Sequence, residues 1–153
     1  MLFGIRFDLR NPAFSGVATA DRYRAALEMA EWVDRRGGLY VSLSEHHGCD
    51  AGYLPSALVM AAAIAARTSK VRIGINAIIA PFHDPLRLAE DAAVVDLLSG
   101  GRLDLTIGGG YVGEEFAMFG VDLAERPARV RETVATLRAA WTGLEAMWAP
   151  TMR

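Results

Sequence analysis

Hydrophobic and polar positions follow two alternating patterns along this chain. Four short apolar runs have the length of β-strands, and they cover residues 2–7, 39–43, 71–80 and 103–107. After each run, apolar residues recur every three or four positions, which predicts amphipathic helices over residues 19–36, 57–67, 85–99 and 127–143. Boundary signals agree with this pattern, because Asp84 precedes Pro85 at the third helix and Gly100-Gly101 ends it.

The predicted order is a strand followed by a helix, repeated four times. Alternating units of this kind form a parallel sheet, so the sequence predicts an α/β fold. Two architectures fit the repeat: a doubly wound open sheet, and part of a (β/α)₈ barrel. The pattern alone leaves both open.

Composition says more about the partners and location of the protein than about its fold. The 153 residues are 52% hydrophobic and 22% charged with a net charge of −2, which is typical of a folded domain. No basic stripe is present, so we expect neither a nucleic-acid partner nor a membrane partner. Cys49 is the single cysteine, and the longest apolar stretch, residues 57–66, is too short to span a bilayer. Arg6 and Asp8 interrupt the region where a signal peptide is apolar, so we expect a cytoplasmic protein.

Candidate chemistry follows the second predicted strand, in the segment Ser44-Glu45-His46-His47-Gly48. The carboxyl end of a parallel strand faces the ligand in such folds. His46 and His47 point to opposite sides of an extended chain, so they cannot share one role. A histidine here either acts as an acid, base or positioning group, or holds the loop by hydrogen bonds. Metal binding with help from His83 is disfavoured by the adjacency of the pair.

Two further polar residues lie in or at the end of predicted strands. Asn76 interrupts the third strand and Asp8 follows the first. A polar side chain in a buried strand needs a partner, so each either satisfies a nearby group or faces a ligand. Cys49 has no flanking base apart from the histidine pair, and we interpret it as an unreactive thiol.

A glycine-rich loop follows the fourth strand and reads IGGGYVGEE from Ile107 to Glu115. Gly108, Gly110 and Gly113 match G-x-G-x-x-G, the pattern of dinucleotide-binding loops. That pattern requires a second strand ending in an acidic residue about 20 positions later, whereas the next long segment here is helical. We therefore favour the interpretation that these glycines let the backbone run close to a flat ligand or a neighbouring strand.

Several longer segments carry a resemblance to a known family. They read SEHHG, IGINAIIAPFHDPLRLAEDAAVVDLLSGGRLDLTIGGGY, EEFAMFGVD and RVRETVATLRAAWTG. In this order they resemble the luciferase-like flavin-dependent monooxygenase family over about residues 1–143. Its signatures are E-H-H after the second strand, D-P-x-R-x-A-E-D opening the third helix, and S-G-G-R before the fourth strand.

The resemblance implies a (β/α)₈ barrel that uses reduced FMN or, alternatively, the deazaflavin coenzyme. Family members oxidise small organic substrates with O₂ or transfer hydride to and from the deazaflavin. Many of them dimerise through their second and third helices, so a homodimer or higher homo-oligomer is implied here. No metal is implied.

The resemblance also assigns site residues by position. His46 matches the histidine implicated in catalysis at the flavin, with Glu45 beside it in the motif. Asn76-Ala77 lies where the family often has a non-prolyl cis peptide. The luciferase branch has an arginine near the flavin phosphate where this chain has Gly109, which leaves room for the deazaflavin or a weakly held flavin. The residues implied to bind the cofactor are Asp8, Asn76, Ala77, Gly108, Gly109, Gly110 and Tyr111.

Length sets the last expectation, because a (β/α)₈ barrel takes roughly 250 residues. Residues 1–143 would form the N-terminal half of the barrel, and we predict an irregular tail over residues 144–153. Four strands cannot close a barrel, so we expect two open edges and a bare apolar inner face. Such a half-barrel would be a fragment of a longer enzyme, or would be completed or covered by oligomerisation. The alternative function is a non-catalytic half-barrel that forms an oligomer and binds no flavin.

Overall fold

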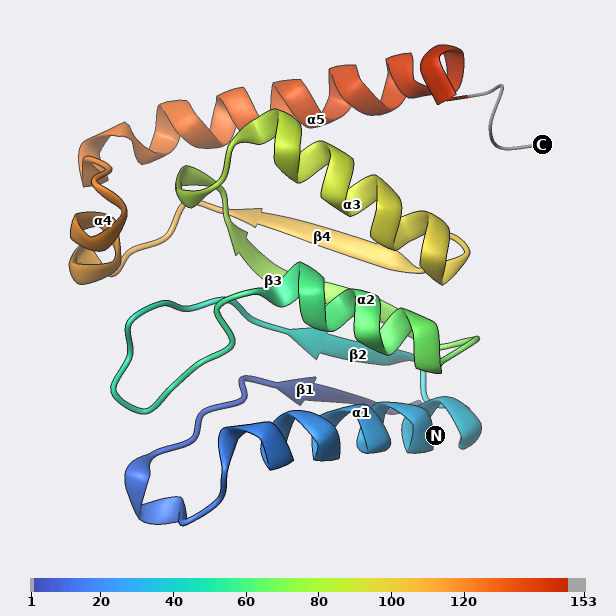
Figure 1. Cartoon of the computed structure of the whole chain (residues 1–153). Helices are drawn as coiled ribbons and strands as arrows, with labels where there is room; N and C mark the ends of the chain where they lie inside the picture. Colours follow the sequence, from blue (N-terminus) through green and yellow to red (C-terminus); the bar gives the residue numbers. More distant parts are fainter. Residues whose placement is uncertain (1, 149–153) are drawn as a thin grey trace.

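The computed structural model describes residues 2–148, with side chains described up to Thr142. It contains four strands and five α-helices, each strand being followed by a helix (Figure 1). Their bounds are β1 Gly4–Phe7, α1 Thr19–Arg35, β2 Tyr40–Leu43, α2 Ala57–Arg67, β3 Arg72–Ile79, α3 Pro85–Ser99, β4 Leu103–Gly108, α4 Gly113–Phe119 and α5 Arg126–Trp148. All eight predicted elements are present, and α4 is an additional short helix after the glycine loop.

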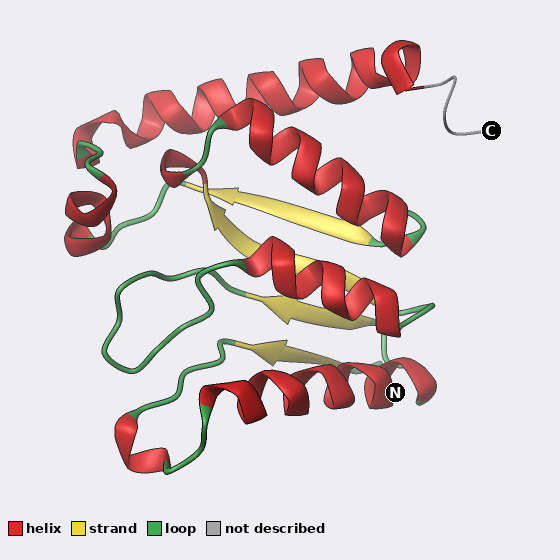
Figure 2. Ribbon diagram, in the orientation of Figure 1, coloured by secondary structure: helices red, strands yellow, loops and turns green. Residues whose placement is uncertain are grey.

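The sheet topology decides between the two architectures. Its strands are all parallel and lie in the order β1-β2-β3-β4. Figure 2 shows the helices on one side of this sheet. A doubly wound fold reverses its strand order and covers both faces, whereas sequential order with helices on one side is the arrangement of a barrel wall. The predicted α/β fold of TIM-barrel-type units is therefore confirmed, with four units present.

The core lies between the sheet and the helices. Up to the register shift at Asn76, strand residues at odd-numbered positions face the helices, and Val41, Leu43, Ile73 and Ile75 are completely buried there. The α2 helix meets them with Ile64 and a series of alanines that allow close approach. Because alternate strand residues point to opposite faces, the even-numbered positions form the other surface of the sheet, which would be the interior of a closed barrel.

That inner face is polar, and the expectation of a bare apolar face is wrong. Its residues are Arg6, Tyr40, Ser42, Arg72, Asn76, Asp104 and Thr106, with Gly4 and Gly74 between them. The Arg72 guanidinium donates to the Asp104 carboxylate at 2.7 Å. Asn76 Nδ2 donates to Tyr40 Oη at 3.1 Å and Ser42 Oγ at 3.0 Å, and Asn76 Oδ1 accepts from Thr106 Oγ1 at 2.6 Å. The apolar content of the strands faces the helices, so water meets a hydrogen-bonded network.

The S-G-G-R motif between α3 and β4 has a structural role. Arg102 is buried, and its guanidinium donates to the carbonyl oxygens of Ala65, Thr68, Val71 and Ser99 and to Thr68 Oγ1. Its backbone N–H also donates to Ser99 Oγ at 2.9 Å. Several of these carbonyls end α2 and α3, where the helix dipole favours a cation. Arg102 therefore ties two helix ends to the start of β3 and β4.

The tail differs from the prediction. We expected the last helix to end at Gly143 and residues 144–153 to be irregular, but α5 continues to Trp148. One glycine costs a helix only about 1 kcal/mol relative to alanine, and the next residues are good helix formers, so the helix propagates through it. Residues 149–153 lie outside the described part of the chain. No helix within residues 2–148 is long and apolar enough to cross a membrane.

Candidate active site

A cavity of about 480 Å³ lies across the carboxyl ends of all four strands, a size within the range of small-molecule sites. Parallel strands bring these ends to one edge, at the left of Figure 1, where the connecting loops and α4 gather. We call this the strand-end cavity. It is lined by Arg6, Ser44, Glu45, His46, Asn76, Ala77, Ile79, Gly108, Gly109, Gly110, Tyr111 and Glu115. Most of the residues assigned to the site from the sequence therefore come together.

Glu45 is a buried carboxylate that holds the wall of this cavity. Its Oε1 accepts from His47 Nε2 at 2.9 Å and His83 Nε2 at 2.8 Å, and its Oε2 accepts from the Ile79 backbone N–H at 2.7 Å. Burial alone would raise the pKa of Glu45, but the hydrogen bonds from His83, Ile79 and His47 outweigh it and lower the pKa below 4.5. Glu45 is thus a positioning residue for both histidines and for β3.

His46 has a different partner, from a distant part of the sequence. Its Nδ1 lies 3.0 Å from Oε1 of Glu115 on α4, and the same oxygen accepts the His47 backbone N–H at 2.9 Å. Because this oxygen acts as an acceptor, we assign the ring hydrogen to Nδ1 of His46. His46 Nε2 has no hydrogen-bond partner among the described side chains and is left for a ligand in the cavity.

The sequence did not assign Glu115 to the site. Only its place after the glycine loop, at the start of a short helix, could have indicated it. Glu115 is 1% exposed, and its Oε2 has no hydrogen-bond partner. The Ser44 Oγ atom is also buried and unpartnered. Both atoms belong to residues that line the strand-end cavity, and they are exceptions to the rule that buried polar groups are almost always satisfied.

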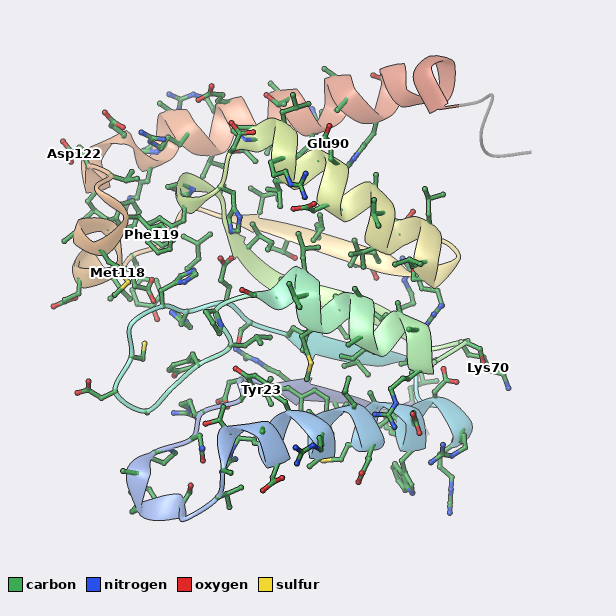
Figure 3. All side chains as sticks on the ribbon, viewed as in Figure 1. Tyr23, Lys70, Glu90, Met118, Phe119 and Asp122 are labelled. Carbon is green, nitrogen blue, oxygen red and sulfur yellow. The ribbon has the colours of Figure 1, made fainter. Side chains whose placement is uncertain are left out.

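Aromatic rings keep the two histidines apart, as their adjacency predicted. His46 packs against Tyr53 at 4.8 Å and Tyr111 at 6.1 Å between ring centroids. His47 points the other way, toward Phe82 at 5.6 Å and Phe119 at 4.7 Å. Phe119 and its neighbour Met118, both labelled in Figure 3, bring α4 against the loop that carries the histidines.

The peptide bond between Asn76 and Ala77 is cis, as the resemblance implied. The strand register shifts between Asn76 and Ile78 at the same point, directly below the cavity. The Asn76 side chain bonds to three side chains of the inner face rather than to backbone groups. It therefore forms the polar floor of the strand-end cavity.

The glycine loop runs close to a neighbouring strand. A Cβ on Gly108 would come 2.9 Å from the Ala77 Cβ, and one on Gly110 would come 2.8 Å from Ile79 Cγ2. Gly110 also has a φ of 69°, which favours glycine. At Gly109 a Cβ would make only ordinary contacts, the nearest at 3.6 Å. The helix that follows the loop has seven residues and leads into another helix, so no dinucleotide-binding unit forms.

Two residues singled out in the sequence lie away from the cavity lining. Asp8 accepts from the Arg10 side chain at 2.8 Å, and it lines a separate hollow between β1 and α1. Cys49 approaches the His47 carbonyl oxygen at 3.5 Å. Burial raises the pKa of this thiol, and the nearby Glu115 and Asp50 carboxylates raise it further, which makes it a poor nucleophile.

A second cavity, of about 390 Å³, lies behind His83 between α3, α4 and α5. We call it the outer cavity. Its lining includes Phe82, Asp84, Phe119, Arg129 and Glu132. Within the described residues, no group of three histidine, cysteine or acidic side chains is arranged to hold a metal ion.

Comparison with known proteins agrees with this geometry. Residues 1–152 match the family model described as luciferase-like monooxygenase. The chain is 32% identical to the oxygenase component of the flavin-dependent trigonelline monooxygenase of Acinetobacter baylyi, over 79% of this chain and 34% of that protein. It is 36% identical to the F420-dependent glucose-6-phosphate dehydrogenase of Amycolatopsis mediterranei, over 61% of this chain and 29% of that protein.

Among solved structures, the monooxygenase RslO1 from Streptomyces bottropensis superposes with a TM-score of 0.85 at 34% identity. The match covers 92% of this chain and 43% of that one. The chain therefore spans about a third of the length of these curated relatives and less than half of this solved relative.

Proposed function

Because this chain belongs to the luciferase-like monooxygenase family, we propose that it supplies the histidine-bearing wall of a flavin site. The ligand would be reduced FMN, or the deazaflavin coenzyme in its place, acting on a small organic substrate. One observation carries the proposal: Glu115 holds His46 through Nδ1, and Nε2 of this cavity-lining histidine has no hydrogen-bond partner among the described residues.

The donor set fits such a group. The cavity is large enough for a planar ring. Asn76 gives it a polar floor, Tyr111 an aromatic edge, and the glycine loop a wall of backbone without side chains. When bound, a reduced flavin supplies two electrons to O₂, and a deazaflavin supplies or accepts a hydride. In this proposal the flavin ring lies against the backbone of the glycine loop, at Gly108, Gly109 and Gly110, and against Ala77. Tyr111 covers its exposed side.

His46 is the group that exchanges a proton with the reacting atoms. Glu115 holds Nδ1–H, so Nε2 can accept or return a proton without the ring turning. Arg126 stands next to the glycine loop, with a guanidinium nitrogen 3.2 Å from the Gly110 carbonyl oxygen. It places a cation beside Gly109, where a phosphate group could be neutralised.

An anaerobic titration tests this function. Reduced FMN and the reduced deazaflavin coenzyme are added separately to the chain, and binding is followed by absorbance and fluorescence. We expect saturable binding of at least one of them. His46→Ala should slow reoxidation of bound reduced FMN by O₂ by roughly 10²-fold, the scale of acid–base catalysis.

His83→Gln is the matched control, because glutamine keeps a donor toward Glu45 and the position lies outside the strand-end cavity. It should leave the reoxidation rate close to that of the unchanged chain. Absence of binding by both coenzymes would instead favour the alternative, a non-catalytic half-barrel that forms an oligomer.

We further propose that the chain forms a homodimer or higher homo-oligomer through the outer surface of α2 and α3. Large apolar side chains are exposed there, namely Val59, Leu86, Val94, Leu97 and Leu98. An apolar patch of this kind marks an interface. Sedimentation equilibrium should show self-association at micromolar concentration, and a stable monomer would contradict it.

A further inference from the structure

The two arginines on the inner face of the sheet differ in their partners. Arg72 pairs with Asp104 across β3 and β4, below the strand-end cavity. Arg6, on β1, lines the cavity itself and forms no ion pair or side-chain hydrogen bond with the described residues. The neighbouring polar groups are already engaged, because Ser42, its register partner, accepts from Asn76.

No carboxylate among the described residues forms an ion pair with Arg6, and the weaker attraction of its charge only helps Arg10 to lower the pKa of Asp8. Glu45 is bound by two histidines and a backbone N–H, and Glu115 is bound by His46 and the His47 N–H. Asp8, two residues further along β1, is paired with Arg10 at 2.8 Å. Among the described residues that line the cavity, acceptors therefore come from the loop after β2 and from α4, and Arg6 of β1 is a cation without an ion-pair partner.

The Arg6 guanidinium is exposed to solvent in this structure, so water satisfies its charge. A ligand that displaced this water would have to supply an anion in its place, because a charged group that loses its water without gaining a partner is strongly disfavoured. A planar guanidinium matches the two oxygens of a carboxylate or the oxygens of a sulfonate or phosphate.

We propose that Arg6 binds an anionic oxygen group of the organic substrate, and so selects for acidic substrates at this site. The inference rests on the proposed function, since it names the substrate class of the same cavity. Arg6 orients the substrate along the cavity, with the anionic end of the substrate at β1 and its reacting part toward His46.

The test compares two planar probes that differ mainly in charge, benzoate and benzamide. Binding to the chain is followed by NMR chemical shifts at neutral pH, with and without saturating FMN. We expect benzoate to bind at least about tenfold more tightly than benzamide, the scale of one charge-assisted hydrogen bond. Arg6→Gln should abolish this preference, and Arg6→Lys should keep most of it. Arg72→Gln, the matched control on the same face, should keep all of it.

A second arm separates the substrate from the cofactor phosphate. FMN and riboflavin are titrated against the unchanged chain and Arg6→Gln. The proposal predicts that their ratio of affinities does not change. Loss of the FMN preference in Arg6→Gln would assign Arg6 to the phosphate and overturn the proposal.

Equal binding of benzoate and benzamide by the unchanged chain would also overturn it, since Arg6 would then serve only to pair with a protein group. The proposed function fails separately, if neither FMN nor the deazaflavin binds. Flavin binding without benzoate preference would thus reject the Arg6 assignment alone.

Discussion

Arg102→Ala is expected to lower the free energy of unfolding by roughly 3–5 kcal/mol, because it leaves several buried oxygens without a donor. The guanidinium of Arg102 binds carbonyls from α2, α3 and the start of β3 together with Thr68 Oγ1, and no other described side chain satisfies them. Lysine can replace only part of this set, since it lacks the planar fork. Urea unfolding followed by circular dichroism measures the change.

Arg72→Ala is the matched control for this prediction. Arg72 also carries short bonds, to Asp104, but both side chains are more than two-fifths exposed. An exposed pair contributes about 0–1 kcal/mol. Equal destabilisation by the two substitutions would show that the buried network at Arg102 is not what joins the helices to the sheet.

Glu45→Ala is expected to produce the second large loss, of roughly 3 kcal/mol or more, because three donors converge on this carboxylate. The substitution leaves the Ile79 N–H, His47 and His83 without their acceptor at the wall of the cavity. Glu31→Ala, which removes a partly exposed carboxylate on α1 that pairs with Arg35 and Arg67, is the comparison. Similar losses for the two would contradict the role given to Glu45.

The pKa of Glu45 gives this prediction a second readout. The pKa is lowered on folding, so the carboxylate stabilises the fold above its unfolded value near 4.5, and this contribution is lost as the pH falls through the folded value. Unfolding free energy measured from pH 7 to pH 3.5 should therefore drop more steeply in the unchanged chain than in Glu45→Gln. Asp34 and Glu31, whose pKa values are also lowered, remain in both proteins and cancel in the difference.

The strands and helices could be predicted because their signals are local. The apolar period and the Asp84-Pro85 and Gly100-Gly101 boundaries placed the elements correctly. The polar inner face was also visible in the alternation of Arg72, Asn76, Asp104 and Thr106, but the prediction weighed only the total apolar content of each run. The end of α5 was predicted wrongly because Gly143 alone was expected to end the helix, as the pair Gly100-Gly101 ends α3.

The site was predictable in part, since residues after parallel strands meet at one edge. That rule brought His46, Asn76 and Gly108 together correctly. It could not place Glu115, because the pairing with His46 depends on how α4 folds back over the loop after β2. It also could not show that Arg6 remains unpaired while Asp8 turns to Arg10, which depends on side-chain geometry.

Chemical-shift mapping with FMN tests most directly whether the strand-end cavity is the flavin site. Added FMN is expected to shift the amide signals of Gly108, Gly109 and Gly110 and the ring signals of His46. The signals of Asp84 and Glu132, which line the outer cavity, should stay in place. Shifts confined to the outer cavity, or no shifts with either FMN or the deazaflavin coenzyme at millimolar concentration, would contradict this assignment of the site.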